Sequence, residues 1–205
     1  MHTSIYDISF FDLLWVLIPV GFVIGIYIKW TNDRTTLFYA LFRMILQLIL
    51  IGYVLTYIFE AKSPYLVVLI LSVMLIAASI IAMRPLVKPE RSVYLYAFVS
   101  IFVGGVFTFL VVIFGVLDLT PWYEPRFLIP IAGMIFANAM NAVSIAAERY
   151  ESELENHQDL HKSRATAYNA ALIPIINALF AVGLVSLPGM MTGQILSGVD
   201  PLIAV

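Results

Sequence analysis

Long apolar runs constrain the fold of this sequence more than any other feature. Five of them can each cross a hydrocarbon core of about 30 Å as a helix; they cover residues 10–28, 37–59, 64–83, 93–117 and 127–147. A sixth run, residues 170–187, contains Pro174 and Gly183 and continues into Pro188-Gly189, which predicts a broken or re-entrant helix. A transmembrane barrel would instead show alternating segments of about ten residues. We therefore expect an all-α fold, a polytopic transmembrane bundle with about six helical membrane segments, the last broken by Pro and Gly.

The composition excludes most soluble enzyme folds. Of the 205 residues, 62% are hydrophobic and 12% are charged, whereas an ordinary soluble domain has about 45–50% and about 25%. A formal net charge of −2 offers no basic surface, so we expect no nucleic-acid partner. With no cysteine in the chain, disulfides and thiolate metal sites are excluded. The sequence also contains no Gly-x-x-x-x-Gly-Lys-Ser/Thr phosphate loop, so any ATP hydrolysis is expected on another chain.

Basic residues in the loops predict the orientation, because Lys and Arg are retained on the cytoplasmic side of a membrane. One side holds Lys62 and Arg126, whereas the other holds a larger set: Lys29, Arg34, Arg84, Lys88, Arg91, Arg149, Lys162 and Arg164. The N-terminus is therefore expected outside, in a multi-pass protein of the cell (inner or plasma) membrane. The charged segment 148–169 then becomes a cytoplasmic helical extension of the fifth span. Residues 1–205 show no repeat or linker and are expected to form a single transmembrane domain.

Arg43 and Gln47 lie four residues apart inside the second run and so share one helix face. An arginine buried in a membrane costs at least a few kcal/mol unless it is paired or hydrated. One interpretation places both side chains along a substrate pathway or gate. The alternative is that Arg43, near the cytoplasmic end of the run, reaches the interface by snorkelling.

Polar residues recur in the fifth run at intervals of three. Asn138, Asn141 and Ser144 form a strip of amides and a hydroxyl among small residues, and Asn177 extends it into the sixth run. Small residues permit close helix approach, and asparagines hydrogen-bond across helices. The strip therefore predicts either substrate contact or a tightly packed helix interface.

Glycines and prolines punctuate the last apolar stretch, which frees backbone carbonyls and allows a hinge. We expect a moving or substrate-lining element here rather than a plain turn, formed by Pro174, Gly183, Pro188, Gly189, Met190, Met191 and Gly193. Met190 and Met191, together with Met134 and Met140, also offer soft thioether ligands for a metal ion. Methionine is more often a packing residue.

His157 and His161 lie four residues apart, and Glu153 precedes them by one turn. On one continuous helix this spacing places two imidazoles and a carboxylate on one face, as in a metal site. The segment is highly charged, so a solvated helix surface is the favoured alternative.

Three stretches resemble the FetB (YbbM) family of ABC-transporter permeases, which is associated with iron export and metal resistance. The first is residues 43–59, beginning Arg-Met-Ile-Leu-Gln, and the second is Pro-Ile-Ala-Gly-Met-Ile at 130–135 followed by Asn-Ala-Met-Asn-Ala at 138–142. The third is Ala-Leu-Ile-Pro at 171–174, leading into Val-Gly-Leu-Val-Ser-Leu-Pro-Gly-Met-Met-Thr-Gly-Gln-Ile-Leu at 182–196. Their order and spacing fit along nearly the whole chain.

The resemblance implies a membrane subunit that pairs with a cytoplasmic ABC ATPase, as two permeases with two ATPases, and moves a metal ion or metal-linked solute outward. ATP and Mg²⁺ would bind the ATPase, and this chain would bind no cofactor. The family's ATPase contact lies between the fifth span and the Ala-Leu-Ile-Pro element. That position holds Glu148, Arg149, Glu153 and Arg164 here.

Two departures from the family pattern lead to a further expectation. The segment 148–169 is shorter than in the family, and the family continues with another transmembrane helix beyond the position of Asp200-Pro201. We therefore expect residues to be missing near His161 and after Val205. A passive channel, an ion-coupled carrier or a membrane scaffold remains the alternative function. Ion-coupled carriers usually place a carboxylate in the membrane, and this chain has only Asp12 near a helix end.

Overall fold

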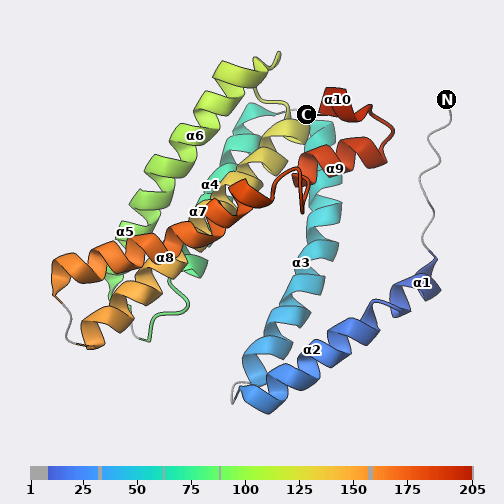
Figure 1. The fold of residues 1–205 in the computed structure, drawn as a ribbon. Coiled ribbons are helices and arrows are strands. Elements are labelled where there is room, and N and C mark those ends of the chain that lie inside the picture. Colours follow the sequence, from blue (N-terminus) through green and yellow to red (C-terminus); the bar gives the residue numbers. More distant parts are fainter. Residues whose placement is uncertain (1–8, 32–33, 62, 88, 157–158, 205) are drawn as a thin grey trace. The chain divides into compact units, whose positions relative to one another are not determined.

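The computed structural model describes residues 9–31, 34–61, 63–87, 89–156 and 159–204, and most of them are helical (Figure 1). The elements in chain order are α1 (Phe10–Leu14), α2 (Leu17–Trp30), α3 (Arg34–Ala61), α4 (Pro64–Ala82), α5 (Arg91–Ile101), the π-helix η1 (Phe102–Val106), α6 (Phe107–Leu110), the π-helix η2 (Val111–Leu117), α7 (Pro125–Glu155), α8 (Leu160–Ala181), α9 (Gly189–Leu196) and α10 (Pro201–Ala204). Apart from an isolated bridge between Val182 and Ser186, the described ranges contain no β-structure. The expected all-α class is confirmed.

Among the described residues, four helices are long and apolar enough to cross a membrane: Thr35–Glu60, Pro64–Ala82, Arg91–Leu117 and Pro125–Glu155. They coincide with the second to fifth runs of the sequence, and shorter helices accompany them. The chain therefore forms a helical membrane bundle with several spans. Within Arg91–Leu117, η1 and η2 are π-helical stretches of an otherwise α-helical span.

The first apolar run is not one uninterrupted helix, and that prediction is wrong. A turn at Trp15 and Val16 separates α1 from α2. Pro19 explains it, because proline has no N–H to donate to the Trp15 carbonyl four residues earlier. The Trp15 carbonyl instead accepts from the Ile18 N–H at 3.3 Å, which tightens the turn and leaves a 14-residue apolar helix, α2.

The sixth run breaks later than the sequence predicts. Helix α8 passes through Pro174 and ends at Ala181, so Pro174 is an interior helix residue and not the point of interruption. The break follows at Gly183, whose φ of +82° lies in the left-handed region and whose N–H donates to the Ser186 carbonyl at 2.9 Å. Because this φ strains any residue with a Cβ, Gly183 fixes the turn that leads to α9.

The charged extension is a helix, a turn and a second helix. α7 continues past the apolar run to Glu155, which confirms that the fifth helix extends beyond the run. It then ends at Asn156, whose side-chain amide donates to the Ser152 carbonyl at 2.8 Å. Asp159 begins α8 by accepting the His161 N–H at 3.1 Å. A single helix through His161 is therefore excluded.

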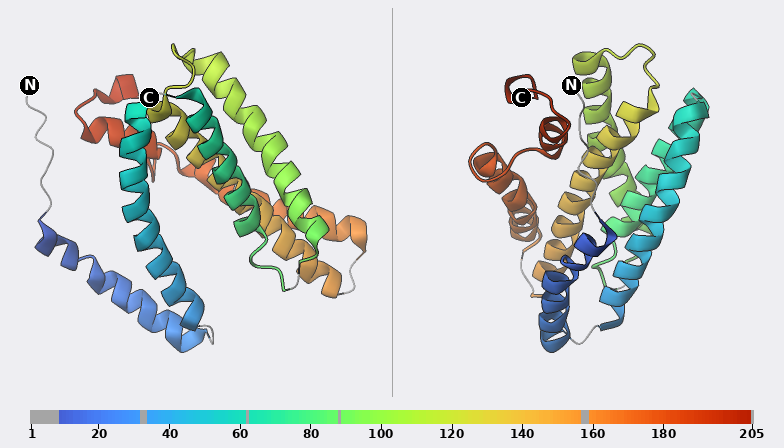
Figure 2. Two further views of the ribbon diagram at one scale, coloured as in Figure 1. Left: turned by 180° about the vertical axis from the view of Figure 1, so that it is seen from behind. Right: turned by 90° about the vertical axis from the view of Figure 1, so that its right-hand side faces the viewer.

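The chain divides into two compact units, Leu55–Ala181 and a second that combines Met1–Val54 with Val182–Val205, and each is described by itself. In Leu55–Ala181, α4, the helix Arg91–Leu117 and α7 run side by side (Figures 1 and 2). They bury a core that includes Val67, Leu75, Ala82, Ile101, Ile113, Leu128, Ala132 and Phe136. Because lipid tails are as apolar as these side chains, close packing between the helices stabilises the unit, and removal of the side chains from water does not. A single domain over residues 1–205 remains a prediction.

Helices η1 and α7 approach each other closely at Gly105. A Cβ placed on Gly105 would lie 3.1 Å from Cδ1 of Phe136 and 3.3 Å from its Cε1. The Phe136 ring is itself buried, with its centroid 6.4 Å from that of Phe109. Gly105 therefore sets the distance between η1 and α7, the helix that carries the asparagine strip.

Candidate functional site

Asn138 and Asn141 line a cleft of about 300 Å³ between α7 and α8, inside the unit Leu55–Ala181. The facing wall comes from α8 and includes Pro174. The complete lining is Asn138, Asn141, Ala142, Ile145, Ala171, Pro174, Ile175 and Ala178. The structure thus places two of the predicted pathway residues and one predicted hinge residue around a common space.

Helix geometry explains why the other two members of the strip do not line the cleft. Successive residues turn by about 100°, so a step of three residues falls short of a full turn by about 60°. Asn141 is one such step from Asn138, but Ser144 is two, and it turns away from the cleft. Asn177 likewise lies six residues from Ala171 on α8 and is exposed outside the lining.

The cleft offers neutral polar groups in an apolar frame. The two asparagine amides each provide an oxygen acceptor and an NH₂ donor. None of the lining residues is ionisable. Such a site suits hydrogen bonding to a polar or hydrated solute, and its oxygens can contact a cation without any formal negative charge.

Arg43 and Gln47 belong to the other unit, on α3. Gln47 is exposed and lines a groove of about 440 Å³ with Met44, Leu48, Leu50, Ile51 and Val54, all from the same helix. Arg43 is half-buried and does not line this groove. Their role in a substrate pathway remains a prediction.

Most of the predicted hinge residues surround a pocket of about 560 Å³ in the C-terminal segment. Its lining is Val182, Gly183, Leu187, Pro188, Met190, Met191, Gln194, Ile203 and Ala204. Gly189 begins α9, and Gly193 lies within it. Two thioethers therefore line one pocket, whereas Met134 and Met140 lie on α7 in the other unit.

The predicted histidine site does not form as the spacing suggested. Glu153 lies on α7 and His161 on α8, with the turn at Asn156 between these helices, so they do not share a helix face. His157 lies outside the described residues. Glu153 instead pairs with Arg149 one turn earlier, while Glu148 and Arg164 are exposed. In the described part of the chain, no group of three His, Asp or Glu residues is arranged to hold a metal ion.

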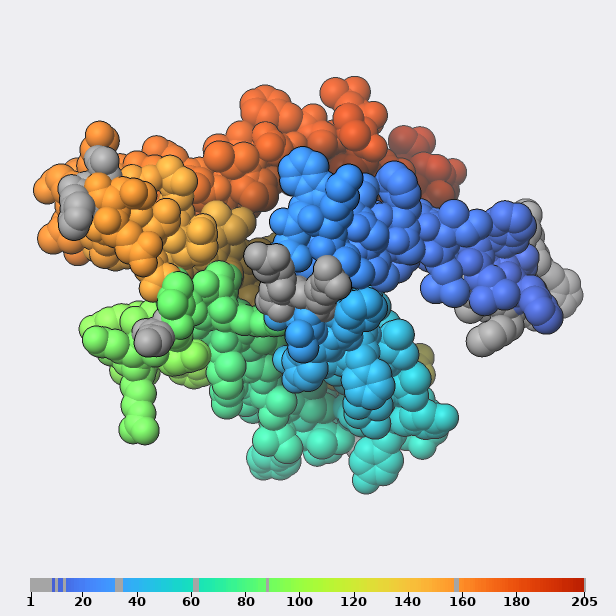
Figure 3. All heavy atoms as spheres, turned by 90° about the horizontal axis from the view of Figure 1, so that it is seen from below, coloured from blue at the N-terminus to red at the C-terminus, as the bar shows by residue number. Residues whose placement is uncertain are grey.

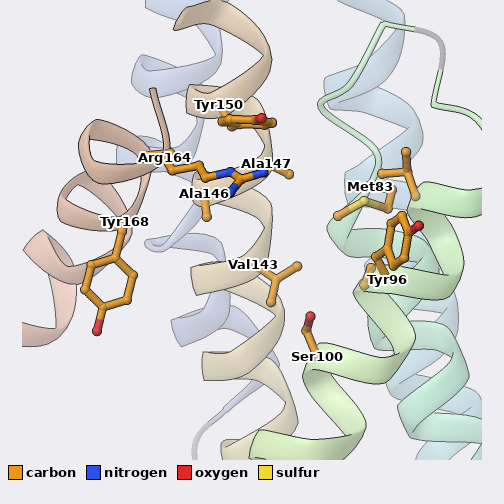
Figure 4. A pocket seen from close by; sticks show the side chains of 12 residues that line it. Met83, Tyr96, Ser100, Val143, Ala146, Ala147, Tyr150, Arg164 and Tyr168 are labelled. Carbon is orange, nitrogen blue, oxygen red and sulfur yellow. The ribbon is translucent and has the colours of Figure 1, made fainter. Parts of the chain in front are cut away.

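A larger cavity of about 540 Å³, which the sequence did not suggest, lies between α5, α7 and α8 (Figure 4). Its polar groups are Tyr96 and Ser100 on α5, Tyr150 on α7, and Arg164 and Tyr168 on α8. Met83, Val93, Ala97, Val143, Ala146, Ala147 and Ala167 complete the lining. Tyrosines beside the basic loops were the signal in the sequence, but only the packing of three helices brings them together.

Comparison with known families identifies the protein group. The family model described as an uncharacterised protein family, UPF0014, matches residues 10–205. The chain belongs to the UPF0014 family. This match includes α7, α8 and the C-terminal segment, so the cleft is part of the family's common region.

Relatives of the chain are found in bacteria and plants. A UPF0014 membrane protein of Synechocystis is 34% identical over 219 residues, covering 98% of this chain and 84% of the relative. The probable iron export permease protein FetB of Escherichia coli is 36% identical, covering 80% of this chain and 67% of FetB. The protein ALUMINUM SENSITIVE 3 of Arabidopsis thaliana is 32% identical, covering 82% of this chain and 65% of that relative. No solved structure matches the chain.

Proposed function

We propose that this UPF0014 protein is the membrane-spanning permease subunit of an ABC transporter that exports iron or another metal ion, free or bound in a small complex, and so gives metal resistance. The similarity to the probable iron export permease FetB carries this proposal. The uncharged amide cleft between α7 and α8 supports it, because a transported solute must be bound weakly enough to leave. ATP and Mg²⁺ bind a separate cytoplasmic ATPase, and two permeases assemble with two ATPases.

The continuity of α7 supports a way to couple the ATPase to the cleft. α7 runs without a break from Asn138 to Glu155, about 25 Å at the rise of an α-helix, and α8 returns along it. Closure of the ATPases pushes the cytoplasmic ends of these helices, where Glu148, Arg149 and Glu153 lie on α7 and Arg164 lies on α8. The push tilts α7 against α8 and opens the cleft to the outside, as alternating access requires. The N-terminus then faces the outside of the cell membrane.

Co-purification with the tagged chain tests whether an ATPase is its partner. The full-length protein is tagged, extracted from its native membrane in mild detergent, and analysed for nucleotide-binding ATPases by mass spectrometry. An ATPase at near-equal stoichiometry, with hydrolysis stimulated by iron salts in the reconstituted complex, is the expected result. Metal flux through vesicles that contain the chain alone, without ATP, would instead establish a channel or carrier.

A matched pair of variants tests the cleft. Asn141→Leu removes a lining amide, whereas Asn177→Leu makes the same change at an exposed α8 position outside the lining. Asn141→Leu loses one or two hydrogen bonds to the solute, each worth about 0.5–1.5 kcal/mol. Losing one should lower ATP-dependent iron transport roughly two- to tenfold, and losing both should lower it further. Asn177→Leu should transport at the unchanged rate. Equal effects of both changes would remove the cleft from the pathway.

A further inference from the structure

The cavity between α5, α7 and α8 has a sharply divided lining. Most of its walls are alanine, valine, methionine and tyrosine ring carbons, and Arg164 is the one formally charged residue among the described lining residues. In Figure 4 the Arg164 side chain extends from α8 toward α7, beside Ala146 and Ala147, and the Tyr150 ring lies along the same helix. The space therefore has an apolar body and a cationic, hydroxyl-bearing rim.

The guanidinium at this rim is not neutralised by a carboxylate in the described ranges. The ion pair at this end of α7 joins Arg149 to Glu153, and neither residue lines the cavity. Arg164 is exposed. A rim cation of this kind favours an anionic ligand, and its planar fork of N–H donors matches a phosphate group.

The cavity lies at the end of the unit where the basic loops gather. Its lining includes Met83, which follows the last residue of α4, and Val93 in the first turn of α5. Arg84 directly follows Met83, and Arg91 precedes Val93 by two residues. Figure 3 looks onto this end and shows orange atoms of α7 and α8 beside the green atoms of the α4–α5 segment. Tyrosines at this level are typical of a membrane–water interface.

We propose that this cavity binds an anionic phospholipid of the cytoplasmic leaflet. The phosphate lies at the Arg164 guanidinium, and an acyl chain packs along Ala97 and Val143. Basic pockets between transmembrane helices on the cytoplasmic side bind anionic headgroups in this way. The predominantly apolar walls favour a lipid over free phosphate, because inorganic phosphate would leave them uncovered. This proposal does not depend on the ATPase or on the identity of the transported solute.

Lipid retention by the permease chain alone tests the proposal. The full-length chain is purified in detergent, mixed with equal amounts of phosphatidylglycerol and phosphatidylcholine, and analysed by native mass spectrometry. We expect preferential retention of one phosphatidylglycerol. Arg164→Gln should reduce this preference about fivefold, the effect of one cation near a charged headgroup. Lys162→Gln is the matched control, because it removes the same charge two residues away without touching the lining, and it should retain the preference.

A variant that fills the cavity tests the contribution of its apolar part to lipid retention separately from that of the Arg164 charge. Ala147→Phe places a ring inside the cavity and should reduce retention of phosphatidylglycerol although no charge changes. Equal retention of the two lipids by the unmodified chain, or equal loss in Lys162→Gln and Arg164→Gln, would overturn the proposal. Complete displacement of the lipid by millimolar inorganic phosphate would also overturn it, since a free anion would then be the ligand.

Discussion

The pair Gly104 and Gly105 offers a sharp test of how η1 packs on α7. Both glycines lie in the same π-helical stretch, so replacing either by alanine changes the conformational entropy of the unfolded chain by the same amount, about 0.5–1 kcal/mol. A Cβ on Gly104 meets no atom within 4 Å, whereas a Cβ on Gly105 meets Phe136 at 3.1 Å. The difference between the two variants therefore isolates the cost of crowding.

The magnitude follows from the burial of Phe136. Phe136 is 4% exposed and its ring lies near that of Phe109, so the ring must shift inside the core to make room for a methyl group. Inserting a methyl group into such a core costs about 1–3 kcal/mol. We expect Gly105→Ala to be less stable than Gly104→Ala by that amount. Since about 1 kcal/mol shifts the midpoint by roughly 2–4 °C in chains of this size, the difference should be several degrees.

Thermal unfolding in detergent, followed by tryptophan fluorescence, measures this difference. Trp122 reports on the relevant unit, because its ring centroid lies 6.3 Å from that of Phe114 in the middle of η2. Identical midpoints for the two variants would refute the close packing of η1 on α7. A third variant, Gly105→Ala with Phe136→Leu, should recover part of the loss by removing the ring carbons that the new methyl group meets.

Two smaller effects follow from the charged turn and the start of α8. The Ser163 hydroxyl is fully buried and has no hydrogen-bond partner within the described residues. Ser163→Ala should therefore leave the free energy of unfolding unchanged or raise it by up to about 1 kcal/mol. A loss of more than about 1 kcal/mol in detergent unfolding would show that the hydroxyl has a partner. Glu153→Gln breaks a pair in which Arg149 is 46% exposed and should cost at most about 0.5 kcal/mol, with the effect disappearing in high salt.

The fold was largely predictable from the sequence because hydropathy and length determine which segments can span a membrane. The exceptions have local causes. Pro19 lies inside the first apolar run and interrupts its helix at Trp15. Counting apolar residues does not reveal this interruption. Pro174 looked equally disruptive, yet α8 continues through it, because helix packing in a membrane can satisfy the freed backbone groups.

The candidate site was predictable only in part. Asn138 and Asn141 line a cleft, whereas Ser144 and Asn177 lie outside its lining. A spacing of three turns Ser144 away from the cleft, and a pathway role for Ser144 and Asn177 remains a prediction. The cavity at Arg164 could not be found from sequence, because it depends on which helices become neighbours. The cavity brings together Met83 and Arg164, which are about 80 residues apart in the chain. The hydrophobic periodicity of a single segment does not show which distant helix that segment will contact.

The π-helical stretches in the span Arg91–Leu117 have a consequence for comparing relatives. A π turn closes its hydrogen bonds five residues apart instead of four, so it holds one residue more than an α turn. Removing one residue from η1 or η2 would restore a regular α-helix and leave both ends of the span in place. A single-residue gap at Phe102–Val106 or Val111–Leu117 in an alignment of UPF0014 proteins would therefore correspond to a structural difference, an α turn in place of a π turn. In such a relative, the residue equivalent to Gly105 is found by counting from the nearer end of the helix.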